Sequence, residues 1–159
     1  MNTFLTPYFL MQGIADAMRN VFKDVYMGDN REQAVNVFEQ ALPISTSADD
    51  MPEFAPYCIV RISDGSILEA NGLETVNVLL LFCVMSEQLD MRGYADVLHL
   101  MQMAKQYLLE HSVISRAFCI VPESIQWSLQ QEESHPYYLG GITLSYHAPA
   151  IIRNEVNYD

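Results

Sequence analysis

The sequence has little positive charge. Its 159 residues include 8 lysines and arginines against 20 acidic residues, which gives a net charge of -12 at pH 7. Binding to duplex or single-stranded nucleic acid requires that basic side chains neutralise phosphates, so this balance argues against autonomous nucleic-acid binding. Two other roles stay open. The protein presents an acidic surface to a basic partner, or it lines a passage that must not hold on to DNA.

Cysteine is also scarce. Cys58, Cys83 and Cys119 lie far apart and form no Cys-x-x-Cys pair, so neither a zinc site nor a redox motif is indicated. Each lies in an apolar, strand-like run, and we predict buried, reduced thiols. The N-terminus has no basic region before its short apolar patch, and the run Val78–Met85 is too short to cross a bilayer. We therefore expect a cytoplasmic protein with no membrane partner.

Motifs for chemistry are missing as well. No nucleotide-binding glycine motif and no Gly-x-Ser-x-Gly occurs, and the histidines lack metal-binding spacing. The adjacent acids Asp49–Asp50 and Glu132–Glu133 lie in polar turns, where solvated carboxylates are more usual than the shielded pairs of an active site. We predict no enzymatic activity, no catalytic residue, no cofactor and no metal. The histidines are His99, His111, His135 and His147.

What is present suits one folded domain. Half of the residues are apolar, with one Trp, nine Tyr and seven Phe, enough to build a core. Hydrophobic periodicity predicts a single domain over 1–159 with the α+β fold: a mostly antiparallel sheet of about five strands with two helices packed on one face. The expected helices are 7–25 and 91–111, and the expected strands are 33–42, 57–63, 74–87, 124–131 and 137–147.

Each expected helix has a start signal and an apolar stripe. Thr6-Pro7 opens the first, and Asp90 caps the second. In the second helix Asp96 is expected to face out, and Leu98 and Met101 are expected to lie buried against Leu80 or Phe82. The predicted inward stripe consists of Tyr94, Val97, Leu98, Met101, Ala104 and Leu108.

The central strand at 74–87 is apolar on both faces. Val76, Val78, Leu80, Phe82 and Val84 alternate with Leu79, Leu81, Cys83 and Met85. Two helices on one side of the sheet cover only one of these faces. Another subunit is one answer to what covers the other.

The last two strands form a hairpin with an acidic connection. Ile125, Trp127 and Leu129 point one way, and Gln126 and its alternate neighbours point the other. In the return strand the one-sided apolar set is Tyr138, Ile142, Leu144 and Tyr146. Gly140-Gly141 within this strand indicates a bulge or a close backbone approach.

Three segments together resemble the tail terminator proteins of long-tailed bacteriophages and prophages, which are also called tail completion or head-tail joining proteins. The first runs from Val35 to Ile62 and contains Phe54-Ala-Pro-Tyr-Cys-Ile-Val-Arg-Ile. The second, Thr75 to Leu109, is an apolar strand followed by Met91-Arg-Gly-Tyr-Ala-Asp-Val-Leu. The third runs from Ile125-Gln-Trp through Pro136-Tyr-Tyr-Leu-Gly-Gly to Pro149.

The resemblance implies a structural virion protein without a catalytic site. Its partners would be further copies of itself in a hexameric ring, a tail tube protein and a head-tail connector protein. DNA would pass through the lumen without specific binding. The protein would be assembled in the cytoplasm of a bacterial host and reside in the virion tail.

Two features suggest where subunits meet. Ser45–Glu53 is a polar, acidic loop expected to order on docking, and the adjacent tyrosines of the return strand offer surplus aromatic surface. The candidate assembly-interface residues are Asp49, Asp50, Glu53, Phe54, Tyr137 and Tyr138.

Two other functions compete with this one. An acidic adaptor or DNA-mimic inhibitor would need carboxylates spaced like phosphates along one face, whereas the acids here cluster in loops. A small-molecule enzyme could use the Tyr- and Trp-rich hairpin as a pocket wall, but the sequence shows no convergent set of acid, base or metal ligands.

Overall fold

The computed structural model describes residues 7–43, 54–67 and 72–149 of the chain. It contains two helices and eight strands, so the α+β prediction is confirmed with a higher strand count than expected. In chain order the elements are α1 (Pro7–Phe22), β1 (Tyr26–Met27), β2 (Gln33–Ala34), β3 (Asn36–Glu39), β4 (Tyr57–Ile67), β5 (Glu74–Met85), α2 (Arg92–Glu110), β6 (Val113–Ile114), β7 (Phe118–Leu129) and β8 (Tyr137–Ala148).

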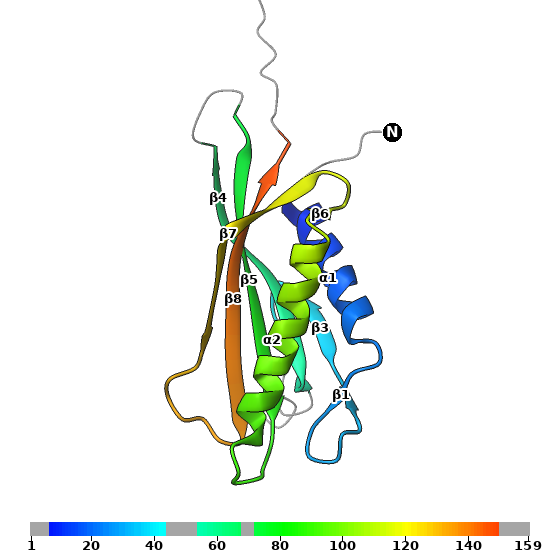
Figure 1. Ribbon diagram of the computed structural model, residues 1–159, viewed down its shortest axis with the longest axis vertical. Helices are drawn as coiled ribbons and strands as arrows, with labels where there is room; N and C mark the ends of the chain where they lie inside the picture. The colour runs from blue at the N-terminus through cyan, green and yellow to red at the C-terminus, as the bar shows by residue number, and fades with distance from the viewer. Residues whose placement is uncertain (1–6, 44–53, 68–71, 150–159) are drawn as a thin grey trace, which may run out of the picture.

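Six strands form the main sheet, in the order β3-β4-β5-β8-β7-β6. All neighbours pair antiparallel except β3 and β4, which are parallel. The two long helices lie side by side on the same side of this sheet (Figure 1). The small strands β1 and β2 form a separate antiparallel pair.

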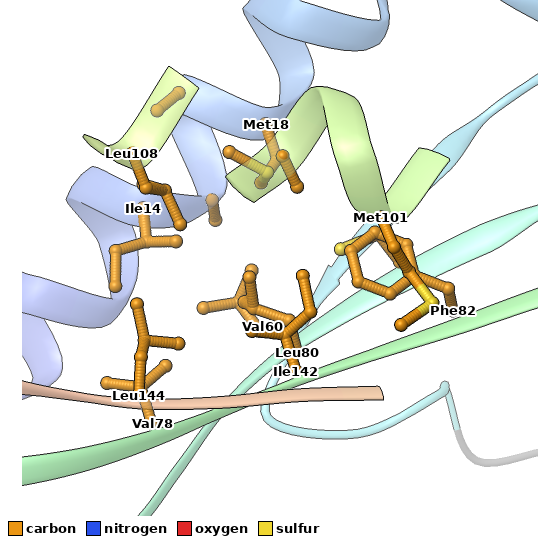
Figure 2. Packing of buried hydrophobic residues seen from close by; sticks show 14 of the residues in the cluster. Ile14, Met18, Val60, Val78, Leu80, Phe82, Met101, Leu108, Ile142 and Leu144 are labelled. Carbon is orange, nitrogen blue, oxygen red and sulfur yellow. The ribbon is translucent and has the colours of Figure 1, made fainter. Parts of the chain in front are cut away.

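The core fills the space between the two helices and the sheet. Burial alternates strictly along β8, and the buried residues of β5 are those of the Val76–Val84 face together with Cys83 from the other face. Side chains of α1 and α2 point toward those of β4, β5 and β8 (Figure 2). The labelled members of this core are Ile14, Met18, Val60, Val78, Leu80, Phe82, Met101, Leu108, Ile142 and Leu144.

Helix α1 begins at Pro7, as predicted, and ends at Phe22 rather than at residue 25. Its buried residues recur at helical spacing, from Leu10 and Ile14 to Met18 and Phe22. Phe22 is fully packed and meets the ring of Phe82 edge-on at 6.4 Å. This contact anchors the end of α1 to the central strand.

The predicted inward face of α2 was wrong at two positions. Leu98 is 38% exposed, whereas Leu100 is fully buried and Met101 is buried as expected. Asp96, expected to face out, is buried, and its carboxylate accepts a hydrogen bond from Arg31 at 2.8 Å. The buried stripe of α2 is therefore rotated about the helix axis relative to the predicted one. An inward aspartate is tolerated because its carboxylate pairs with Arg31, which lies between β1 and β2.

Helix α2 starts and ends with backbone caps. Met91 is the N-cap in a left-handed conformation, and Asp90 accepts a hydrogen bond from the Arg92 N–H at 3.1 Å. At the other end the N–H of His111 donates to the Tyr107 carbonyl, and the His111 ring stacks on that of Tyr107. The prediction that Asp90 caps the helix was wrong, because the N-cap is Met91 and Asp90 is the residue before it.

The strand expected at 33–42 is two short strands with different partners. Residues 33–34 pair with β1, and residues 36–39 pair with β4. Gln40 has a positive φ of 69°, which ends the second piece. The change of partner next to Asn36 explains why no single strand spans this segment.

The strand expected at 124–131 begins earlier, at Phe118, and its pairing with β8 is interrupted between Val121 and Gln126. Strand β4 likewise continues to Ile67, beyond the expected end at residue 63, with an irregularity between Ile62 and Asp64. Both extensions lie at the same end of the sheet, since Ile67 pairs with Glu74 of β5 and Cys119 pairs with His147 of β8.

Glycine permits two close approaches between α2 and β8. A Cβ on Gly93 would collide with the ring of Tyr138, and a Cβ on Gly140 would lie 2.6 Å from the Met101 sulfur. The close approach predicted for the Gly140-Gly141 pair is confirmed, whereas β8 pairs with β5 without a bulge there.

Candidate assembly surface

The face of the sheet away from the helices, called here the outer face, carries apolar side chains with no element packed over them in the described residues. Leu79 and Leu81 of β5 and Leu139 of β8 are half-buried on this face, as the two-sided pattern of the central strand predicts. They line an open groove of about 490 Å³ together with polar residues of β7. The sheet therefore has one face in the core and one open face with an apolar strip along its middle.

Glycine forms part of the floor of this groove. Gly141 pairs with Leu81 across the β5–β8 ladder, and a Cβ added to it would touch Leu79 and Leu81 at ordinary van der Waals distance. The hollow exists because no side chain rises there. Leu139 was not among the candidate interface residues, and Gly141 was expected only at a bulge or a close approach. Their alternation with the buried Tyr138, Gly140 and Ile142 would have placed both on the outer face.

The outer face is nearly uncharged. Among the described residues that strand register places there, Asp64 is the only acid and Arg61 is the only lysine or arginine. Asp64 accepts a hydrogen bond from Asn77 at 2.6 Å, and Arg61 donates to the Gln40 carbonyl at 2.8 Å. In a chain with 20 acidic residues, a face this neutral can approach another protein surface without strong repulsion.

Near β3, a cluster of aromatic rings covers the outer face. Phe38 contacts the rings of Phe54 and Tyr57 edge-on, at centroid distances of 5.7 and 6.3 Å. Tyr57 in turn lies opposite Cys83, whose pKa is raised to about 11 by burial. The aromatic cluster gives the outer face a packed, apolar end beside the groove.

The residues expected at an assembly interface are divided between surface and core. Phe54 is half-buried in the aromatic cluster, and Tyr137 is half-buried on the outer face beside Met85. Tyr138 is only 3% exposed and packs edge-on against Tyr94 of α2, so it adds no free aromatic surface. Asp49, Asp50 and Glu53 lie outside the described residues.

No group of three potential metal ligands gathers within the described residues. The groove lining contains no titratable side chain in that part of the chain. Neither of the described helices has the length and apolarity needed to cross a membrane.

No protein-family model matches the sequence, and no curated protein matches it. A chain from a solved virion of the native gene transfer agent (GTA) particle aligns with 92% of this chain and 98% of its own length. The sequence identity is 8% and the TM-score is 0.44. At this level of similarity, function has to be argued from the residues of the chain itself.

Proposed function

We propose that this protein is a structural component of a phage-like particle, and that it closes the end of the tail as a ring and joins the tail to the head. The observation that carries the proposal is the outer face of the sheet. Its middle is apolar and hollowed, and it is nearly uncharged on a protein whose net charge is -12. An apolar hollow of this kind is unfavourable in a free monomer and suits a subunit that contacts other proteins of an assembly.

The segments that carry the resemblance to tail terminators form one continuous region of the fold. The strand that follows Phe54 is β4, the segment from Thr75 is β5 and α2, and the third segment is the β7–β8 hairpin. These elements form the middle of the six-stranded sheet and the helix that packs on it. The resemblance therefore concerns the part of the molecule that presents the outer face.

In this role the partners are further copies of the chain, expected to form a hexamer, the tail tube protein and the head-tail connector. DNA passes through the lumen without specific binding, and the excess of acidic residues repels the phosphates. The protein acts without a cofactor and without catalysis. In support, the described residues that line the groove of the outer face include no acid or base for proton transfer.

Native mass spectrometry across a series of salt and protein concentrations tests the proposal. Like charges on neighbouring subunits repel, and salt screens them over roughly 8–10 Å at physiological ionic strength. We expect monomers at low salt, and rings at high salt or on the ends of purified tail tubes. A protein that stays monomeric throughout and does not bind tail tubes would contradict the proposal.

A further inference from the structure

Part of the sheet edge at β7 has no neighbouring strand among the described residues. Strand β6 pairs with Phe118 and Cys119 at the start of β7, and no other described strand besides β8 lies along its second half. The segment Ile125–Leu129, the open edge, contains no proline and no charge. Natural proteins usually blunt such edges, because unpaired N–H and C=O groups invite pairing with another chain.

Register shows which backbone groups of the open edge are available. The Gln130 N–H donates to the Leu139 carbonyl at 3.0 Å, so Gln130 forms a hydrogen-bonded pair with β8. Alternation then directs the N–H groups of Ser128 and Gln126 toward β8, and those of Trp127 and Leu129 away from it. The Trp127 side chain beside them is 55% exposed.

At the opposite edge of the sheet, strand β3 and the Gln40 side chain cover part of β4. Strand β3 covers β4 only as far as Val60. Beyond it the Gln40 side chain donates to the Ile62 carbonyl and accepts from the Ile62 N–H, both at 3.0 Å, in place of a strand. The segment Ser63–Ile67 has β5 on one side and no described strand on the other, and Ile67 is 50% exposed.

We propose that the open edge of one copy pairs antiparallel with Ser63–Ile67 of β4 in a second copy, with Trp127 opposite Gly65. This inference rests on the proposed function, because it requires subunits to assemble, and it names the surfaces through which they do so. Within one subunit three antiparallel pairings separate β4 from β7, so the two strands run in opposite directions. Rotation about an axis that runs along the strands keeps every strand direction unchanged. The β7 edge of one copy therefore lies antiparallel to the β4 edge of the next copy around the ring.

The side chains match in this register. Trp127 pairs with the buried Ile142, and Gly65 pairs with the buried Val76, so both lie on the helix side of the sheet. The indole would cover the bare backbone of Gly65, an arrangement known to stabilise glycine in strands. Ile125 would lie opposite Ile67, and Glu132 would approach the guanidinium of Arg61.

The charges favour this contact over a symmetric one. Two open edges paired with each other about Trp127 would bring Glu123 of each copy toward Glu132 of the other. Repulsion at both ends disfavours that dimer. Pairing with β4 replaces one repulsion with an attraction to Arg61, and a head-to-tail contact closes into a ring.

The two edges lie at different heights along the sheet. Trp127 pairs with Ile142, which pairs with Leu80 of β5, whereas Gly65 pairs with Val76 of β5. The two edge residues therefore lie four β5 residues apart along the strand direction. The stagger is roughly 14 Å at about 3.4 Å per residue. A closed sheet with tilted strands requires a stagger of this kind between its first and last strands.

A cysteine pair tests the contact. Directly opposed residues in an antiparallel pair have Cα atoms about 5.5 Å apart, within reach of a disulfide. In a Cys119→Ser background, we expect Ile125→Cys combined with Ile67→Cys to give a ladder of linked chains on oxidation of the assembled protein. Each single variant should stay unlinked. The matched control is Gln126→Cys with Ile67→Cys, whose side chains point to opposite faces of the sheet.

A second pair of variants isolates the backbone contact. Trp127→Pro removes both the indole and the outward N–H, whereas Trp127→Val removes only the indole. Since proline is tolerated where a strand's N–H faces solvent, both should remain folded as monomers. We expect the proline variant to need at least about threefold more protein for half-assembly than the valine variant, which corresponds to one lost hydrogen bond per contact.

The outcomes separate the two proposals. Rings in native mass spectrometry without the Ile125–Ile67 linkage, or with equal assembly of the two Trp127 variants, would overturn the strand pairing and leave the proposed function intact. Failure of the unmodified protein to assemble at any salt concentration or on tail tubes would overturn both. A linkage ladder with the control pair unlinked supports the pairing.

Discussion

At the scale of single residues, the three cysteines differ in a way that chemistry can measure. Burial raises the pKa of the Cys58 thiol and raises that of Cys83 to about 11, so both stay protonated and shielded near neutral pH. Cys119 is exposed, contrary to the prediction of three buried thiols. We expect iodoacetamide to modify the native protein at Cys119 and to spare Cys58 and Cys83 until it unfolds.

Mass spectrometry of the alkylated protein locates the modified residue, and Cys119→Ser is the control that should leave the native protein unmodified. Equal labelling of all three cysteines in the folded protein would contradict the assignment.

The error at Cys119 has a simple physical origin. Its neighbours Phe118 and Ile120 are apolar, which suggested a fully buried run, but they alternate with it along β7. Because alternate side chains point to opposite faces, burying Phe118 and Ile120 turns Cys119 outward. The prediction relied on the apolar composition of the run. The two-residue period of a strand would have placed the Cys119 side chain on the exposed face.

At the scale of elements, α2 offers a comparison between two leucines on adjacent faces. Leu100 is fully buried in the core and Leu98 is 38% exposed beside Trp127. We expect Leu100→Ala to lower the free energy of unfolding by about 2–5 kcal/mol because it leaves a cavity. Leu98→Ala should cost less than about 1 kcal/mol.

Urea denaturation of the two variants measures this difference, with Leu98→Ala serving as the matched control for helix propensity. A larger loss of stability from Leu98→Ala would restore the helix face that the sequence first suggested. Equal losses would place the apolar stripe between the two residues.

The long elements were predictable because they contain several repeats of a hydrophobic period. Helix α2 and strands β5 and β8 follow their expected ranges to within two residues. Strands β1 and β6 have two residues each and therefore no period to detect. Asp96 was misplaced because its partner Arg31 lies 65 positions earlier in the chain, a separation that local patterns do not register.

At the scale of the whole molecule, the apolar pattern on both sides of the central strand predicted that one face of the sheet would lack a covering layer. The structure places Leu79 and Leu81 on that face. The groove could not be predicted from β5 alone, since its shape depends on the pairing of Gly141 with Leu81 and on the polar residues of β7. Pairing between distant strands decides which alternating residues become neighbours.

The charge of the whole molecule leads to a prediction about DNA. With 8 basic residues against 20 acids, the protein has few cations to displace counterions from phosphates. Two of the basic side chains, Arg19 and Arg31, are already within 3.0 Å of the carboxylates of Asp16 and Asp96.

We expect no appreciable binding of a labelled DNA duplex at physiological salt in fluorescence anisotropy, for either the monomer or the ring. Lowering the salt should not create binding, because weaker screening also strengthens the repulsion. A micromolar complex that weakens as salt is added would contradict this expectation, and with it the idea that DNA slides through the assembled ring without being held.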